Sequence, residues 1–167
     1  MCGSMFLIII KVIHYAFFAI IKLKKSLPTF LRMMYYPMLY KETKGGTMKP
    51  KIEDAKFGSV TIDSEVYEHD VVIRLSGVVE KRKKKLSKQR YGTSHTISLE
   101  EAKHILDEGA KHLIIGTGQS GMLKLSDEAE KYFRENGCSV VLLPTLQAVK
   151  VWNETKGKTI GMFHVTC

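Results

Sequence analysis

Three closely spaced glycines follow a short apolar run, and this segment has the residue types best suited to binding a ligand. The run His112–Ile115 is typical of a buried strand. A glycine lets the backbone turn tightly and brings its N–H group close to a ligand. The candidate pocket residues of this segment are Gly116, Thr117, Gly118, Gln119, Ser120 and Gly121.

The glycine spacing matches the dinucleotide-binding fingerprint G-x-G-x-x-G, but the surrounding sequence does not. In that motif the helix begins within the glycine run, so that its N-terminus faces the pyrophosphate. Here Met122–Leu125 separates the glycines from Ser126, which is the next residue suited to capping a helix. The ribose-binding acid expected about 20 residues later is missing, and no Gly-Lys-Ser/Thr follows as in a P-loop. We therefore predict no cofactor.

Two interpretations of the glycine segment remain open. In the first, the N–H groups of the loop and the Ser120 hydroxyl form a pocket for a small anion. In the second, the glycines only allow the chain to cross tightly beneath another element.

A second set of polar residues follows the apolar run Val140–Leu143 and Pro144. Ligands of open α/β sheets bind outside the carboxyl ends of the strands. Gly116 and Thr145 each follow a predicted strand, so we expect their loops to share one rim of the sheet. Thr145 and Asn153 are the polar residues added to the candidate pocket here. No carboxylate pair or Ser–His–Asp set accompanies them, so the sequence suggests no catalytic acid or base.

His164 and Cys167 raise the question of a metal site or a Cys–His pair. Residues three apart on a strand point to opposite faces, so these two converge only if the strand ends between them. Two ligands are also too few for a closed zinc site. We predict no metal, and we interpret His164 as a strand histidine that is hydrogen-bonded to a neighbour and borders the candidate pocket.

Capping residues and periodicity predict the helices that position these side chains. Ser98 and Glu101 have the spacing of a capping box, and the helix should run to about Glu108. A second helix should begin near Ser126 and end at Asn136. Thr145 can cap a third helix, which should reach about Lys156 with Leu146, Val149 and Trp152 facing inward.

Strands are predicted on both sides of these helices. Phe57–Glu80 reads as short strands with tight turns, which indicates an antiparallel meander. Val140–Leu143 is continuously apolar, as expected of a strand that is buried on both faces. Thr159–Val165 supplies the last strand. Strands alternating with helices are typical of a layered α/β domain.

The segment Lys81–Arg90 has seven basic residues in ten, with the sequence KRKKKLSKQR. One interpretation is a patch that binds anions or nucleic acid. Aromatic residues that could stack on bases are not interleaved with the charges, so we interpret the run as a solvated hairpin tip and expect no nucleic-acid partner.

Residues 1–47 differ in composition from the rest of the chain. They contain six Lys, one Arg and one acid, and subtracting this +6 from the total of +9 leaves +3 for residues 48–167. Met5–Ile21 is apolar except for Lys11 and His14, which makes it short and costly as a membrane span. Residues 1–47 are either a weak membrane anchor or, as we favour, not part of the natural protein. Residues 48–167 form the predicted domain.

The cysteine pattern bears on the compartment. The chain has three cysteines, with no C-x-x-C pair and no regular framework. Neither a disulfide scaffold nor a zinc site is indicated. We therefore expect a reducing compartment, the cytoplasm.

The sequence resembles a family of small proteins of unknown function. This family includes an adipogenesis-associated animal protein and the branch of mitochondrial complex I assembly factors. The resemblance covers Ile52–Cys167 and leaves residues 1–47 without a counterpart. Its motifs are the glycine segment, Thr145 with Ala148, Asn153 and the final His164-Val165-Thr166-Cys167.

The resemblance implies a three-layer α/β domain with a mixed central sheet, to which the sequence adds three helices and an N-terminal strand meander. It implies no established enzymatic activity and no cofactor. We expect a non-enzymatic binding or assembly module with a protein partner. The alternative is a small-molecule or anion-binding protein, or an enzyme, with its site at the rim of Gly116–Gly121 and Thr145.

Overall fold

The computed structural model describes residues 49–167, so the predictions for residues 1–47 lie outside the described part of the chain. A five-stranded sheet forms the centre of the domain, with the strand order β5-β4-β10-β7-β9. β7, β9 and β10 run parallel to one another. β4 pairs antiparallel with β10, and β5 pairs antiparallel with β4. The five strands are β4 (Val71–Ile73), β5 (Val79–Lys81), β7 (His112–Thr117), β9 (Ser139–Leu143) and β10 (Thr159–His164).

The predicted meander is divided between two sheets. Its first part pairs as an antiparallel sheet in the order β1-β2-β3, whereas β4 and β5 join the central sheet. The meander also begins earlier than predicted, because Ile52 starts β1 and Phe57 lies in the exposed turn after it. The small sheet consists of β1 (Ile52–Lys56), β2 (Ser59–Ile62) and β3 (Glu65–Tyr67).

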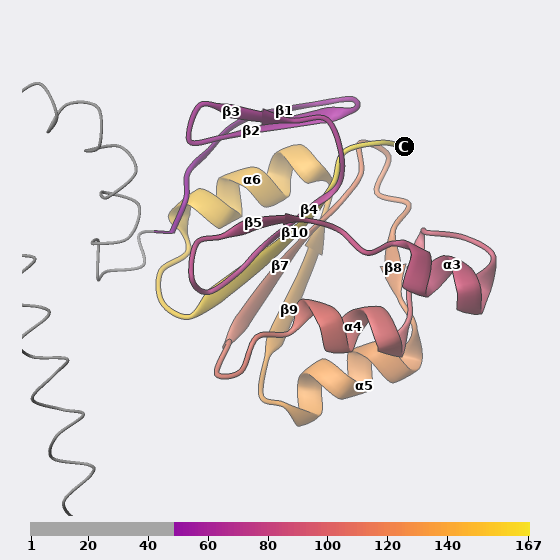
Figure 1. Ribbon diagram of the computed structural model, residues 1–167. Helices are drawn as coiled ribbons and strands as arrows, with labels where there is room; N and C mark the ends of the chain where they lie inside the picture. The colour runs from indigo at the N-terminus through magenta and orange to yellow at the C-terminus, as the bar shows by residue number, and fades with distance from the viewer. Residues whose placement is uncertain (1–48) are drawn as a thin grey trace, which may run out of the picture. The chain divides into compact units, whose positions relative to one another are not determined.

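Helices cover both faces of the central sheet and give the domain its layers (Figure 1). One face packs against α4 (Leu99–Ile105) and α5 (Asp127–Glu135), with Phe133 and Ile105 fully buried. The other face packs against α6 (Thr145–Glu154) and the small sheet, around Trp152 and Phe163. The predicted three-layer α/β domain with a mixed sheet is therefore confirmed.

Both predicted serine caps are present. The Ser98 hydroxyl accepts the N–H of Glu101, and the Ser126 hydroxyl accepts the N–H of Ala129. α4 nevertheless ends at Ile105 instead of Glu108, because the Asp107 carboxylate accepts hydrogen bonds from the Arg74 guanidinium and the Leu75 N–H. These bonds hold the segment after Ile105 against the loop that follows β4.

The prediction that Thr145 caps the third helix is wrong. Pro144 occupies the N-cap position, and Thr145 is the first helical residue. Val149 and Trp152 face inward as predicted, but Leu146 is 56% exposed. None of the helices within residues 49–167 has the length and apolar character needed to span a bilayer.

The basic run is not a hairpin tip. Lys81 ends β5, and a fourth helix, α3 (Lys85–Tyr91), follows it and closes at Gly92, whose φ is 69°. The run is not wholly solvated either, because Arg82 and Ser87 are buried. Arg82 turns inward because two carboxylates, described below, pair with it.

The prediction that Val140–Leu143 is buried on both faces is also wrong. β9 is the last strand of the central sheet, and within residues 49–167 it pairs with β7 alone. Val141 is 40% exposed and Leu142 is 39% exposed. A short strand at the parallel edge of this sheet therefore carries apolar side chains that neighbouring elements leave half uncovered.

The third sheet of the described residues has two parallel strands. It joins β6 (Thr96–Ile97) to β8 (Lys124–Leu125). Hydrogen bonds from Lys124 N to His95 O (2.8 Å) and from Ser126 N to Ile97 O (3.0 Å) extend this pairing. The pairing of β6 with β8 thereby fixes His95 relative to the segment that follows the glycine loop.

Candidate functional site

The predicted rim at the carboxyl ends of β7, β9 and β10 is present, and Thr145 joins its parts. The Thr145 hydroxyl donates to His164 O (2.7 Å) and accepts from Gly118 N (2.9 Å). Thr145 N in turn donates to Gly118 O at 3.0 Å. A buried threonine at the start of α6 thus links the glycine loop to the end of β10.

The glycines of this rim lie under other parts of the chain. Gly116 is inside β7, where an added Cβ would lie 2.9 Å from Thr145 Oγ1. Gly118 has a φ of +94°, and an added Cβ would lie 2.5 Å from Thr166 O and 2.6 Å from Cys167 O. Glycine is required at position 118 by both the backbone conformation and the space. This close approach favours the crossover interpretation of the segment.

The N–H groups of the loop are partly used within the chain. Gly118 N donates to Thr145, and Ser120 N donates to Cys167 O at 2.7 Å. Thr117 is buried, whereas Gln119, Ser120 and Gly121 are exposed. The small-anion pocket therefore stays a prediction, with fewer N–H groups available than the sequence suggested.

His164 is hydrogen-bonded to a neighbour, as predicted. Its Nδ1 lies 2.9 Å from Asp70 Oδ2, and Asp70 Oδ1 accepts the Val165 N–H at 3.1 Å. Burial opposes ionisation of Asp70, but the contacts with His164, Val165 and Arg82 outweigh it and lower the Asp70 pKa to about 2. The carboxylate is ionised at neutral pH, so the Nδ1 facing it carries the hydrogen.

A buried charged network extends from Asp70 into the domain. Arg82 Nη1 lies 3.4 Å from Asp70 Oδ2, and Arg82 Nε donates to Glu101 Oε1 at 2.6 Å. Glu101 also accepts the Ser87 hydroxyl, and that hydroxyl accepts the Ser98 N–H at 2.8 Å. Sequence reasoning assigned Glu101 to a capping box and Arg82 to a solvated run. Nothing in the local pattern indicated that the two would pair.

Sequence reasoning also missed His95, which lies at the rim next to Cys167. His95 Nε2 is 3.2 Å from Cys167 Sγ, and the His95 and His164 rings are 5.6 Å apart between centroids. β10 ends at His164, which allows the chain to turn and bring Cys167 back to the same side. His95 lies 72 residues away in the sequence, so no spacing motif relates the three.

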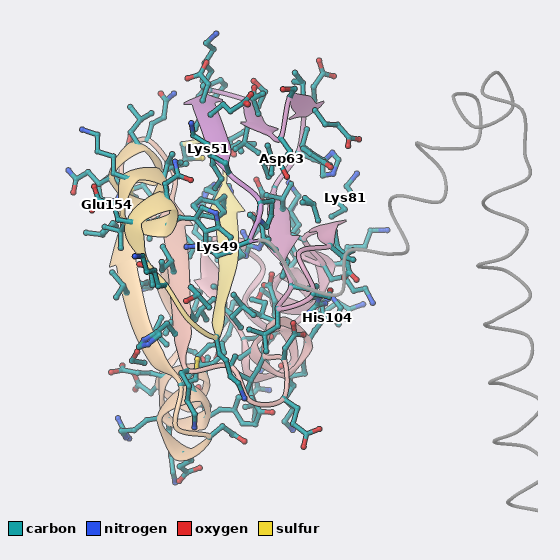
Figure 2. The ribbon with its side chains drawn as sticks, turned by 90° about the vertical axis from the view of Figure 1, so that its left-hand side faces the viewer. Lys49, Lys51, Asp63, Lys81, His104 and Glu154 are labelled. Atoms are coloured by element: carbon teal, nitrogen blue, oxygen red, sulfur yellow. The ribbon has the colours of Figure 1, made fainter. Side chains whose placement is uncertain are left out.

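Asn153 does not join the rim. Its side-chain amide lies near the carboxyl end of α6, where it accepts from Ile52 N (3.0 Å) and donates to Ile52 O (2.7 Å). Lys49 reaches the same end of the helix and donates to the carbonyl groups of Trp152 and Thr155 (Figure 2). These contacts hold β1 and the residues before it against α6, so the role of Asn153 in the fold is structural.

Two surface hollows lie at the other end of the parallel strands. One has a volume of about 620 Å³ and is bordered by Arg74, Glu80, His104 and Asp107. The other, of about 410 Å³, lies between Lys49, Arg74 and Thr159, where β10 begins. Arg74 is already paired with Glu80 and Asp107 there, at 2.9 Å and 3.1 Å.

Comparison with solved structures confirms the fold. The conserved hypothetical protein PH1505 from Pyrococcus horikoshii OT3 is 40% identical, with a TM-score of 0.66 over 70% of this chain and 99% of that one. A protein named MT938 is 34% identical, with a TM-score of 0.60 over 71% and 99% of the two chains. A Bordetella parapertussis protein at 17% identity shares the fold, with a TM-score of 0.58 over 72% and 98%.

A protein family also matches the chain over most of the described domain. Its description is "Protein of unknown function (DUF498/DUF598)", and it matches residues 52–161. The matched range contains every described strand up to β9, the first residues of β10, all four described helices, and the glycine loop with Thr145. The chain belongs to the DUF498/DUF598 family of proteins of unknown function.

Proposed function

We propose that this protein is a non-enzymatic binding or assembly module that recognises another protein at the edge of β9. The partner contributes an extended apolar segment, which adds to the central sheet as a further strand. The observation that carries the proposal is the half-exposed apolar surface of Val141 and Leu142 on an edge strand. Exposed apolar edges favour pairing with another chain, and natural proteins usually protect them with charges or bulges.

β9 directs some of its backbone N–H and C=O groups toward the open edge, where an added strand could pair with them. Ser139 N donates to Lys111 O at 2.9 Å, in a parallel register that pairs His112 with Ser139. Successive residues of a strand direct their N–H and C=O groups to alternate sides. The backbone groups of Ser139, Val141 and Leu143 therefore face β7, whereas those of Val140 and Leu142 face the edge. Four backbone groups are in position to pair with an added strand.

The side chains around this edge are suited to an apolar partner. β9 has the sequence SVVLL and carries no charge. Val141 and Leu142 point to opposite faces of the sheet, so an added strand meets apolar surface on both faces. Leu146, in the first turn of α6 directly after β9 and Pro144, is 56% exposed. Alternating side-chain contacts of this kind give specificity to strand addition.

The family resemblance supports the class of function. The branch of mitochondrial complex I assembly factors consists of proteins that act through protein partners, as the proposal requires. The rival function, a small-molecule site at the rim, has less support, since Gly118 N and Ser120 N are already used within the chain. The proposal keeps the cytoplasm as the compartment, because Cys138 and Cys167 are both free thiols.

Lysine substitutions at the edge test the proposal. Purified full-length protein, V141K/L142K and V66K are immobilised at equal density and exposed to extract of the native cells. Val66 is the matched control, because it is 60% exposed and lies on β3, at an edge of the small sheet. Retained proteins are identified by mass spectrometry, purified, and titrated against the three chains.

We expect a discrete partner whose dissociation constant rises at least tenfold for V141K/L142K and is unchanged for V66K. Recovery of further copies of this chain alone would mean that β9 mediates self-association instead. Equal retention by all three proteins, or by none of them, would contradict the proposal. Circular dichroism and melting curves establish that the variants are folded, since both edge side chains are partly in solvent.

A further inference from the structure

Three side chains with metal-binding atoms converge on the rim, apart from the β9 edge. They are His95, which precedes β6, His164, which ends β10, and Cys167, which follows it. One potential ligand atom from each lies within 4.8 Å of the others. Within this cluster, His95 Nε2 lies 3.2 Å from Cys167 Sγ.

The fold holds these three segments together through backbone contacts. Lys124 N donates to His95 O, which ties His95 to β8. Ser120 N donates to Cys167 O, which ties Cys167 to the glycine loop. Gly118 leaves space for the carbonyl groups of Thr166 and Cys167, since a Cβ there would lie 2.5 Å and 2.6 Å from their oxygens. A side chain at position 118 would therefore displace the backbone of Thr166 and Cys167, and with it the Cys167 thiol.

The second nitrogen of each imidazole already has a partner. His164 Nδ1 lies 2.9 Å from Asp70 Oδ2, and His95 Nδ1 lies 3.4 Å from Thr93 Oγ1. Metal-binding histidines usually donate their other N–H to a carboxylate or another oxygen, which fixes the ring and the tautomer. In His164 this leaves the lone pair on Nε2, which faces Thr166 Oγ1 at 3.2 Å. The pair Asp70–His164 thus has the outer-shell arrangement of a metal ligand.

We propose that His95, His164 and Cys167 bind one divalent metal ion of the zinc type. Two imidazole nitrogens and a thiolate are ligands that zinc and cobalt prefer. Zinc–ligand distances of about 2.0–2.3 Å in tetrahedral geometry place ligand atoms about 3.3–3.6 Å apart. The ligand atoms lie within 4.8 Å of one another, so binding requires small shifts of these side chains, of which Cys167 is exposed and His95 is half-buried. Three protein ligands leave one coordination position for water or an external ligand.

The sequence argued against a metal because His164 and Cys167 offer two ligands only, and His95 supplies a third. His164 and Cys167 alone are two ligands, and they were expected on opposite faces of a strand. The end of β10 at His164 brings both to one side, and His95 adds the third ligand. None of the three ligands lies on β9, so the metal site and the proposed protein interface can be tested independently.

Cobalt(II) titration of the full-length, untagged protein tests the site, because a thiolate bound to cobalt absorbs in the near ultraviolet. We expect saturation at one cobalt per chain, with displacement of the absorption by zinc. C167S should abolish the thiolate absorption, and H95A should weaken cobalt binding about tenfold or more. His95 is partly exposed and Cys167 exposed, so metal-free circular dichroism and melting of both variants should match the original protein.

Matched controls separate this cluster from other cysteines and histidines. C2S/C138S retains Cys167 as its single cysteine and should keep the full absorption. H112A removes an exposed histidine away from the cluster and should leave the affinity unchanged. Absence of the thiolate absorption, its persistence in C167S, or an equal loss of affinity in H95A and H112A would overturn the proposal.

Discussion

The Glu101 carboxylate lies against the Arg82 guanidinium, with 2.6 Å between Arg82 Nε and Glu101 Oε1 and both side chains fully buried. The same guanidinium lies 3.4 Å from Asp70, which in turn binds His164. A charged network therefore links α4 and the segment after β5 to the rim at the end of β10. Separating such a pair leaves a buried charge without a partner, which is costly.

Glu101→Gln should lower the free energy of unfolding by about 3–5 kcal/mol, because it removes one partner of a buried ion pair. Equilibrium urea unfolding measures this loss. Glu100→Gln is the matched control, since Glu100 is the exposed neighbour on the same helical turn, and it should change stability by about 0.5 kcal/mol or less. Similar effects of the two substitutions would contradict a central role for the Arg82–Glu101 pair.

Gly118→Ala should destabilise the protein by more than the cost of a positive φ alone. That cost is about 1–2 kcal/mol, and the methyl group would also overlap two backbone oxygens at 2.5 Å and 2.6 Å. Gly157→Ala isolates the first effect, because Gly157 has a φ of +92° and nothing within 4 Å of an added Cβ. Urea unfolding of both variants provides the comparison, and equal losses would show that the contact with Thr166 and Cys167 is absent in solution.

Cys167 should react with iodoacetamide well before Cys138 in the folded, metal-free protein. Cys138 is 3% exposed, and burial raises the pKa of its thiol, although the charge of Lys111 opposes the shift. The thiolate is the reactive form, so a raised pKa leaves less of it at a given pH. Peptide mapping by mass spectrometry at several times would resolve the two sites. Equal rates in the native protein, without denaturant, would contradict the burial of Cys138.

A chain that begins at Met48 should fold by itself. Among the described residues, both hydrophobic clusters begin at or after Ile52, and Thr47–Cys167 is one compact unit. We expect the circular dichroism of an α/β protein and a cooperative urea transition with the midpoint of the full-length chain. A broad transition, or aggregation of the shorter chain while the full chain stays folded in detergent, would favour the membrane-anchor interpretation of residues 1–47.

Local signals predicted the starts of α4 and α5 and most strands correctly. Ser98 and Ser126 cap helices because a serine oxygen satisfies an N–H group regardless of the rest of the fold. α3 was missed because its sequence lacks an apolar periodicity, and its buried residue is Ser87. A continuous apolar run does not distinguish a buried strand from an edge strand, so the exposure of Val141 and Leu142 emerged only from the sheet order.

The sequence predicted which residues meet at the rim only for those that lie at or next to the end of a strand. Gly118, Thr145 and His164 met at one rim because parallel strands share a carboxyl edge. Asp70, Arg82 and His95 arrive from distant segments, and their pairing depends on how the antiparallel strands join the sheet. Long-range contacts of this kind leave no spacing pattern in a single sequence.

Backbone amide exchange at β9 tests the proposed strand addition most directly. In the free protein, the amides of Val140 and Leu142 should exchange fast, and those of Val141 and Leu143 should be protected by pairing with β7. Saturation with the partner identified in the retention experiment should slow the exchange of Val140 and Leu142 by at least tenfold, as measured by NMR. Unchanged fast exchange of these two amides in the saturated complex would contradict the claim that β9 accepts a strand from another protein.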